Sequence, residues 1–175
     1  LPNWQQPPDI QLLYCLQNDA SGGESLFADG ARVINALREQ DPEALAILSE
    51  TPIDFRFQDD THDIAIKAPV ITLDSQGELV EIRLNNWIRD TLHLPAEKMA
   101  DWYRAYKVLW QLFHSDVHQL EFTLTPGQMV AFDNRRVLHG RREFDPNSGA
   151  RHLQGTYLDR DMLASRLRVL ARTTA

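Results

Sequence analysis

The sequence predicts a mainly β protein with flanking helices, folded as a β-sandwich or jelly roll. Short segments of alternating apolar residues recur along the 175-residue chain, and turn residues separate them. One longer stretch, Pro95–His114, instead repeats its apolar residues at three- and four-residue steps, as an amphipathic helix does. A GxGxxG loop and a regular alternation of strand and helix are both missing from the sequence. A β-sandwich or jelly roll is therefore favoured over a parallel Rossmann sheet.

Composition narrows the class of protein further. The chain is 43% hydrophobic and 25% charged, which is typical of a globular domain, and its length suits one domain. No apolar run approaches the roughly 20 residues that a membrane-spanning helix needs, and no signal peptide is recognisable. Cys15 is the single cysteine, so an internal disulfide is excluded and a cytoplasmic location is expected.

The charge balance bears on the partner. Eighteen basic and 25 acidic residues give a net charge of −7, which disfavours nucleic acid. We therefore expect a small-molecule partner and no membrane association.

The first elements follow from short patterns. Ile10–Leu16 predicts a buried strand, and Asn18–Gly23 a tight turn. A phosphate loop at Ser21-Gly22-Gly23 is disfavoured because no Gly-Lys-Ser/Thr follows. Asp29 is placed to cap a helix that runs through Gln40, and Asp41-Pro42-Glu43 starts a second short helix.

Three alternating patterns predict the next strands. Their apolar positions are Ile53, Phe55 and Phe57, then Ile64, Ile66 and Val70, then Val80, Ile82 and Leu84. His62 lies among Asp59, Asp60 and Asp63, which raises the possibility of a metal site. A polar loop is the preferred interpretation, because neighbouring carboxylates in a turn are ordinary solvated groups.

The second half of the chain contains the clearest helix. The aromatic stripe of Pro95–His114 is expected to face the core. A strand over Leu120–Leu124 follows, and a last helix capped by Asp159 places Leu163, Leu167 and Leu170 on one face.

The stretch from Val130 to Asp159 contains the main candidate residues. Val137-Leu138 leads into His139, so we expect this imidazole at a strand end. Asp145–Gly149 is rich in turn residues and is expected to return the chain to pair with that strand, which would place Arg151 on a neighbouring strand. Residue pattern alone leaves two interpretations open: an anion or metal pocket, or a structural histidine beside a solvated Arg-rich surface.

A resemblance favours the first interpretation. The segments FDNRRVLHGRREF, RHLQGTYLDRDMLASRLRVL, PPDIQLLYC, SGGESLFADG and LNNWIRDT together resemble the gamma-butyrobetaine dioxygenases. These belong to the 2-oxoglutarate/Fe(II) oxygenase family and are related to trimethyllysine and taurine dioxygenases. The resemblance covers nearly the whole chain and implies a double-stranded β-helix that is incomplete at its N-terminal side.

The resemblance assigns roles to four residues near the co-substrate. His139 matches the distal histidine ligand of the iron, and Arg151 matches the arginine that pairs with the far carboxylate of 2-oxoglutarate. Ser25 matches a hydroxyl presented to 2-oxoglutarate, and Leu13 matches a residue lining the same pocket. Arg suits this role because its planar fork donates two charge-assisted hydrogen bonds to a carboxylate.

Two further residues match substrate contacts. Asn85 matches an asparagine that helps to bind the substrate carboxylate, and Tyr157 matches one wall of an aromatic cage. A trimethylammonium group donates no hydrogen bonds, so aromatic faces must recognise it through cation–π attraction.

The implied activity is hydroxylation of gamma-butyrobetaine to L-carnitine, with release of succinate and CO2. It uses Fe(II), 2-oxoglutarate and O2, with ascorbate as the expected reductant, and a homodimer is a possible assembly. Trimethyllysine dioxygenase is the alternative, although RHLxGxY and SRLRxL favour the butyrobetaine branch. A catalytically silent jelly-roll fragment with a binding or assembly role is a further alternative.

One departure from the family motif supports that last alternative. In the family a His-X-Asp motif immediately precedes the residues that match Leu1-Pro2. His62-Asp63 lacks the spacer, and His114-Ser115-Asp116 lies far along the chain. We therefore expect residues 1–175 to be the C-terminal part of one catalytic domain that binds iron poorly by itself.

Overall fold

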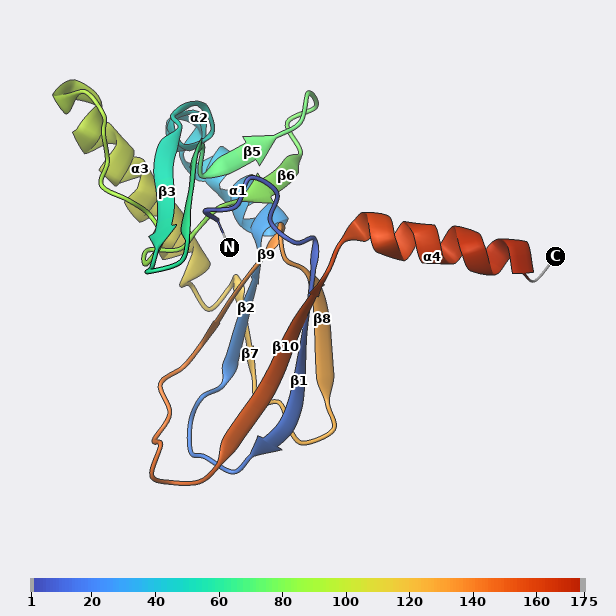
Figure 1. Ribbon diagram of the computed structural model, residues 1–175. Helices are drawn as coiled ribbons and strands as arrows, with labels where there is room; N and C mark the ends of the chain where they lie inside the picture. The colour runs from blue at the N-terminus through green and yellow to red at the C-terminus, as the bar shows by residue number, and fades with distance from the viewer. Residues whose placement is uncertain (1, 174–175) are drawn as a thin grey trace. The chain divides into compact units, whose positions relative to one another are not determined.

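The computed structural model describes residues 2–173 and divides into two compact units (Figure 1). The first unit comprises the described residues up to Pro7, Leu26–Glu121 and Arg135–Gly140. The second comprises Pro8–Ser25, Phe122–Asn134 and the chain from Arg141 onward.

The described residues form ten strands and four helices. In chain order they are β1 (Ile10–Asn18), β2 (Ser25–Asp29), α1 (Gly30–Gln40), α2 (Pro42–Glu50), β3 (Ile53–Gln58), β4 (Asp63–Ala68), β5 (Ile71–Leu73), β6 (Leu79–Ile82), α3 (Ala96–Phe113), β7 (Gln119–Phe122), β8 (Met129–Asp133), β9 (Val137–Arg141), β10 (Arg151–Leu158) and α4 (Arg160–Thr173). The mainly β prediction with flanking helices is confirmed.

The first unit packs α1, α2 and α3 with the hairpins β3-β4 and β5-β6. The predicted helix starts are confirmed, because the side chains of Asp29 and Asp41 accept hydrogen bonds from backbone N–H groups of Ala31 and Ala44. Fully buried side chains hold the unit together, among them Val33, Leu37, Leu48, Phe55, Ile71, Trp102 and Leu109. Burial of one such side chain stabilises the fold by roughly 1.5–3 kcal/mol.

The aromatic stripe of α3 was only partly predicted correctly. Trp102, Tyr106 and Phe113 are buried, but Tyr103 and Trp110 are 47% and 36% exposed. The apolar pattern therefore spans more of the helix circumference than the core covers.

Several strand predictions also need correction. The strand Ile10–Leu16 was predicted to be buried, but Tyr14 and Leu16 are exposed. Leu124 lies outside β7, which ends at Phe122. Val70 lies outside β4 because Pro69, which cannot donate to a strand ladder, follows the last residue of that strand. Leu84 lies outside β6, which ends at Ile82. A second three-stranded sheet, in the order β7-β2-β9, belongs mainly to the first unit.

The second unit is built on an antiparallel sheet in the order β10-β1-β8, with β1 in the centre (Figure 1). Cys15 of β1 is fully buried, and its thiol donates to the carbonyl of Leu124. We expected β10 to pair with β9, and this was wrong: β10 pairs with β1, and β9 belongs to the other sheet. The turn-rich loop after β9 returns the chain, as predicted, but to a different partner strand.

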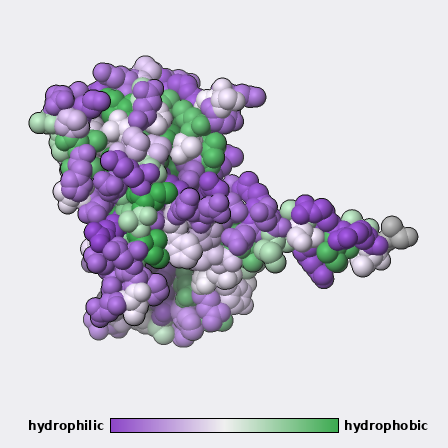
Figure 2. Space-filling view, turned by 45° about the horizontal axis from the view of Figure 1, so that its top comes forward, coloured by the Kyte–Doolittle hydropathy of each residue, from purple (hydrophilic) through white to green (hydrophobic). Residues whose placement is uncertain are grey.

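Helix α4 has no buried residue. Its apolar side chains Met162, Leu163, Leu167 and Leu170 are all exposed, although three of them share the predicted face. Figure 2 shows hydrophobic and hydrophilic side chains next to each other along this helix. Within the described residues, none of the helices is long and apolar enough to cross a membrane.

Candidate functional site

Arg151 occupies the first position of β10, opposite Asn18 of β1. Its Nε atom is buried and has no hydrogen-bond partner among the described residues, and its Nη2 donates a long hydrogen bond, 3.4 Å, to the carbonyl of Gly23. A buried guanidinium atom that lacks an acceptor is costly, because desolvation is not compensated. Among the described residues this atom has no acceptor, so an anionic ligand would offset the cost of its burial.

The turn Gly22-Gly23 forms one side of this site. Both glycines have positive φ, 79° and 76°, a conformation that residues with a Cβ rarely adopt. The Gly22 position is closed by the backbone of Glu143, whose carbonyl oxygen would lie 2.6 Å from an added Cβ. The Gly23 position faces Arg151, whose Nε would lie 3.2 Å from a Cβ. The predicted tight turn is confirmed, and its glycines leave room for the guanidinium.

The electrostatic surroundings of Arg151 are unusual. The guanidinium carbon of Arg151 lies 5.7 Å from the centroid of the Phe144 ring. The guanidinium carbon of Arg141 lies 4.3 Å from the centroid of the same ring. Among the described residues neither arginine forms an ion pair. Loss of hydration and, secondly, the charge of Arg141 lower the pKa of Arg151 from its usual value. Two cations without a carboxylate partner favour the binding of an anion.

Ser25 and Leu13 belong to the same unit as Arg151. Ser25 follows the glycine turn by two residues and is 5% exposed, and its hydroxyl has no hydrogen-bond partner among the described residues. Leu13 pairs with Gly155 of β10, and its Cδ2 would lie 3.3 Å from a Cβ at that glycine. Gly155 therefore gives the Leu13 side chain room over β10.

Alternate side chains of β10 share one face of the sheet with Arg151, as expected for a strand. Gln11, Leu13 and Cys15 oppose Tyr157, Gly155 and Leu153, so these side chains share one face of the sheet with Arg151. After Cys15 the register of β1 shifts by one residue, and Asn18 is the residue opposite Arg151. Tyr157 is six residues beyond Arg151, roughly 20 Å along the strand. It is 43% exposed and leaves a ring face open to a ligand.

His139 lies in the first unit, in the middle of β9. The prediction of a strand end was wrong, because β9 continues through Gly140 to Arg141. The side chain is exposed, yet loss of hydration lowers the pKa of His139, and a weaker hydrogen bond with Val137 acts in the opposite direction. The neutral imidazole, which is the form that binds metals, is thereby favoured.

The described residues contain no cluster of three His, Cys, Asp or Glu side chains that could hold a metal ion. Hydrogen bonds within the segment Asp59–Asp63 organise it as a polar loop. One Asp59 carboxylate oxygen accepts hydrogen bonds from the backbone N–H groups of Thr61 and His62. His139 could therefore provide one ligand to a metal, and the described residues do not complete the set.

Asn85 also belongs to the first unit, where it begins the turn that follows β6. Its Oδ1 accepts from the backbone N–H of Trp87, 2.9 Å away, and its carbonyl accepts from Ile88 and Arg89. No described residue accepts from its Nδ2 amide. The amide nitrogen is thus the part of this side chain that can donate to a ligand.

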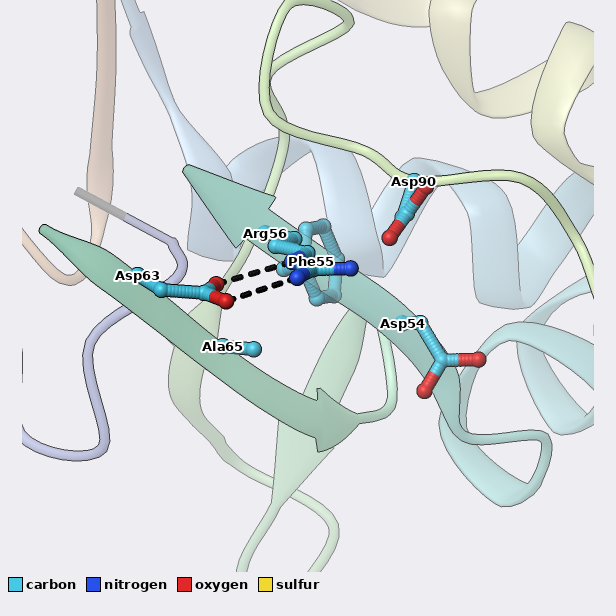
Figure 3. Close-up of a pocket in the computed structure, with 6 residues that line it drawn as sticks. All are labelled: Asp54, Phe55, Arg56, Asp63, Ala65 and Asp90. Carbon is cyan, nitrogen blue, oxygen red and sulfur yellow. Dashed lines mark hydrogen bonds and ion pairs between the residues drawn. The ribbon is translucent and has the colours of Figure 1, made fainter. Parts of the chain in front are cut away.

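A surface pocket of about 410 Å³ lies on the β3-β4 hairpin and contains none of the predicted site residues (Figure 3). Arg56 and Asp63 form a two-point ion pair across it, with contacts of 2.8 and 2.6 Å. Asp54 and Asp90 line the remainder. The exposed ion pair occupies the only basic group in this pocket, so the pocket offers no second anion site.

Sequence reasoning missed two members of the Arg151 site. Arg141 lies in the Arg-rich stretch for which a solvated surface was one of the two interpretations, and Phe144 was not considered. Their contact with Arg151 depends on how the loop 142–150 returns to β1, and local periodicity does not encode that path. An arginine three residues before an aromatic residue, both next to a turn, was the one available signal.

Known proteins resemble this chain over nearly its whole length. Residues 1–157 match the family model described as "Taurine catabolism dioxygenase TauD, TfdA family". The chain is 48% identical over 172 residues to a gamma-butyrobetaine dioxygenase of Pseudomonas sp. (strain AK-1), covering 98% of this chain and 45% of that protein. It is 38% identical to the human gamma-butyrobetaine dioxygenase, with 97% and 45% covered. A trimethyllysine dioxygenase of Rattus norvegicus is 32% identical, with 95% and 40% covered.

Solved structures give the same fold. An asparagine oxygenase in complex with Fe(II), hydroxyasparagine and succinate superposes with a TM-score of 0.69 at 25% identity, covering 90% of this chain and 47% of that one. The non-heme iron oxygenase OrfP, in complex with Fe and alpha-ketoglutaric acid, gives 0.65 at 20% identity, covering 94% and 49%. The chain thus spans about half the length of the relatives it matches. Its predicted jelly roll of the 2-oxoglutarate oxygenases is confirmed, and the chain belongs to the TauD/TfdA dioxygenase family.

Proposed function

We propose that the full-length protein hydroxylates gamma-butyrobetaine to L-carnitine and releases succinate and CO2. The observation that carries this proposal is Arg151, a partly buried guanidinium with an orphaned Nε and no acidic partner among the described residues. Two relatives of the chain, at 48% and 38% identity, are named gamma-butyrobetaine dioxygenase.

The Arg151 site fits the far carboxylate of 2-oxoglutarate. A carboxylate would satisfy the buried Nε and offset the repulsion between Arg151 and Arg141. The hydroxyl of Ser25, a residue that is 5% exposed, would donate a further hydrogen bond to the co-substrate. Leu13, on the same sheet face, would provide an apolar wall.

His139 would be the one iron ligand from this chain. The remaining ligands of a two-His, one-carboxylate site would come from outside residues 2–173, and this chain would be the C-terminal part of the catalytic domain. Iron and 2-oxoglutarate would supply the oxidising chemistry, and the protein would position both.

Asn85 and Tyr157 would recognise the substrate. The Nδ2 amide of Asn85 would donate to the substrate carboxylate, since its Oδ1 is already occupied by Trp87. The partly exposed ring of Tyr157 would face the trimethylammonium group, an interaction worth on the order of 0.5–2 kcal/mol.

The test is succinate production by the full-length protein with gamma-butyrobetaine and, separately, with trimethyllysine, each with Fe(II), 2-oxoglutarate and O2. Substrate-stimulated succinate with gamma-butyrobetaine is the expected result. Preference for trimethyllysine would instead identify the protein as a trimethyllysine dioxygenase, the activity named for the relative at 32% identity. A protein without any iron-dependent turnover of 2-oxoglutarate would instead be the silent binding fragment.

Three accompanying features remain proposals of the same kind. Ascorbate would act as reductant and should raise the number of turnovers per iron. The enzyme would work in the cytoplasm, where fractionation can locate it. A homodimer is supported by the exposed apolar side chains of α4, and light scattering would measure it.

A further inference from the structure

The turn Asn85–Asp90 is fixed from two sides within the first unit. Toward β3, the N–H of Arg56 donates to Ile88 and the N–H of Asp90 donates to Asp54, both at 2.9 Å. Phe55 and Arg89 form a β-bridge between these hydrogen bonds. Figure 3 shows Asp90 approaching Asp54, Phe55 and Arg56 on this side.

Helix α3 fixes the other side of the turn. The hydroxyl of Tyr106 donates to the Oδ1 of Asn86 at 2.6 Å. The guanidinium carbon of Arg89 lies 5.0, 5.5 and 5.6 Å from the ring centroids of Tyr106, Trp102 and Tyr103. The turn is therefore tied to α3 by one hydrogen bond and by one cation over three rings.

Stability alone does not account for this arrangement. Within residues 2–173, the buried Nη1 of Arg89 has no hydrogen-bond partner, and neither has the buried indole Nε1 of the neighbouring Trp102. Apolar side chains of similar volume would fill the same space without an unsatisfied donor. The cation and the hydroxyl specify where the turn lies, and the first residue of the turn is Asn85.

We propose that Tyr106 and Arg89 are positioning residues that hold the Asn85 amide in place for the substrate carboxylate. This inference rests on the substrate role proposed for Asn85. It adds that the specificity of the reaction depends on two side chains that do not touch the substrate. Burial raises the pKa of Tyr106 to about 12, so its hydroxyl remains a donor throughout the neutral range.

The chain provides a matched control. Tyr103 lies on the same helix and under the same guanidinium, but its hydroxyl has no hydrogen-bond partner among the described residues. Tyr106→Phe and Tyr103→Phe each remove one hydroxyl and keep the ring. Only the first removes the bond to Asn86.

Steady-state kinetics of the full-length enzyme test the proposal. In Tyr106→Phe the KM for gamma-butyrobetaine should rise roughly 3- to 10-fold, the range expected for one lost neutral hydrogen bond. The kcat and the KM for 2-oxoglutarate should remain within about 2-fold of the parent values, and Tyr103→Phe should match the parent in all three. Substitution of Arg89 should also raise the KM for gamma-butyrobetaine. The rise above the parent value should be smaller in Arg89→Lys, which keeps the charge, than in Arg89→Met. The inference would be overturned if Tyr106→Phe and Tyr103→Phe had equal KM values for gamma-butyrobetaine. It would also be overturned if Tyr106→Phe lowered kcat and raised both KM values to a similar extent.

Hydrogen exchange separates this inference from the proposed function. If the parent enzyme does not hydroxylate gamma-butyrobetaine, the proposed function fails and the kinetic test has no substrate. The amides of Ile88 and Arg89, which donate to Asn85, still report on the turn. Faster exchange in Tyr106→Phe than in Tyr103→Phe supports the positioning role, and equal exchange overturns it.

Discussion

The Nε atom of Arg151 lies so close to the backbone of Gly23 that a Cβ at this glycine would be 3.2 Å away. Gly23→Ala should therefore displace the guanidinium and weaken 2-oxoglutarate binding several-fold. Anaerobic titration of 2-oxoglutarate into the Fe(II)-loaded full-length protein measures the change.

Gly127→Ala is the control for backbone strain in that experiment. Gly127 has a φ of 87°, and an added Cβ would meet nothing within 4 Å. Both variants incur about 1–2 kcal/mol of left-handed strain, but only Gly23→Ala should lower the affinity. If the two variants bind 2-oxoglutarate equally, the glycine turn is not part of the co-substrate site.

Charge and shape at Arg151 can be separated by two substitutions. Arg151→Lys keeps the charge and loses the planar fork, whereas Arg151→Met keeps much of the stem and loses the charge. Both substitutions should weaken the binding of 2-oxoglutarate more than the binding of gamma-butyrobetaine. The loss should be larger in Arg151→Met, because severing a charged pair costs several kcal/mol, whereas losing the fork geometry costs roughly 1–2 kcal/mol. The same titration tests this order against Arg166→Met on the exposed helix α4. Unchanged affinity in all variants would refute the assignment.

Local patterns predicted most of the elements but few of their partners. The caps at Asp29 and Asp41 and the helix Ala96–Phe113 were found because their signals lie within a few residues of sequence. The pairing of β10 with β1 was missed, since it joins residues some 140 positions apart and no local period encodes it. The same reason explains the Arg151 site: its cation was recognisable from the resemblance, but the shared ring of Phe144 was not.

His139 should be required for every turnover. His139→Ala in the full-length enzyme should abolish Fe(II)-dependent consumption of 2-oxoglutarate, because a neutral imidazole ligand is lost. Succinate formation and Fe(II) affinity measure this loss. His152→Ala is the control, since His152 is an exposed histidine of β10 outside the face shared by Arg151 and Tyr157. Retained decarboxylation in His139→Ala would exclude His139 as a ligand.

Tyr157 should affect substrate affinity more than the iron chemistry. Tyr157→Leu removes a ring face and should raise the KM for gamma-butyrobetaine by up to roughly 10-fold, with Fe(II) affinity unchanged. Tyr14→Leu is the matched control, because Tyr14 is a similarly exposed tyrosine on the opposite face of the same sheet. Lost iron binding with an unchanged KM would contradict the cage role.

The carboxylate of Asp29 should make the stability of the first unit pH-dependent. It caps α1 and forms a two-point ion pair with Arg136, at 2.8 and 2.6 Å, and this hydrogen bonding lowers the pKa of Asp29 below 3.8 despite some desolvation. Because the folded-state pKa is below the unfolded one, the stabilisation is complete above about pH 4 and is lost as pH falls through the folded-state pKa.

Asp29→Asn keeps a capping oxygen and loses the ion pair, so it should reduce the free energy of unfolding at pH 7 by at most about 1 kcal/mol, since the pair is half exposed. Denaturant unfolding at pH 7 and pH 3 should show that the difference between parent and variant shrinks in acid, and that it vanishes at both pH values in an Arg136→Met background. A difference independent of pH would show that the cap, and not the charge, carries the effect.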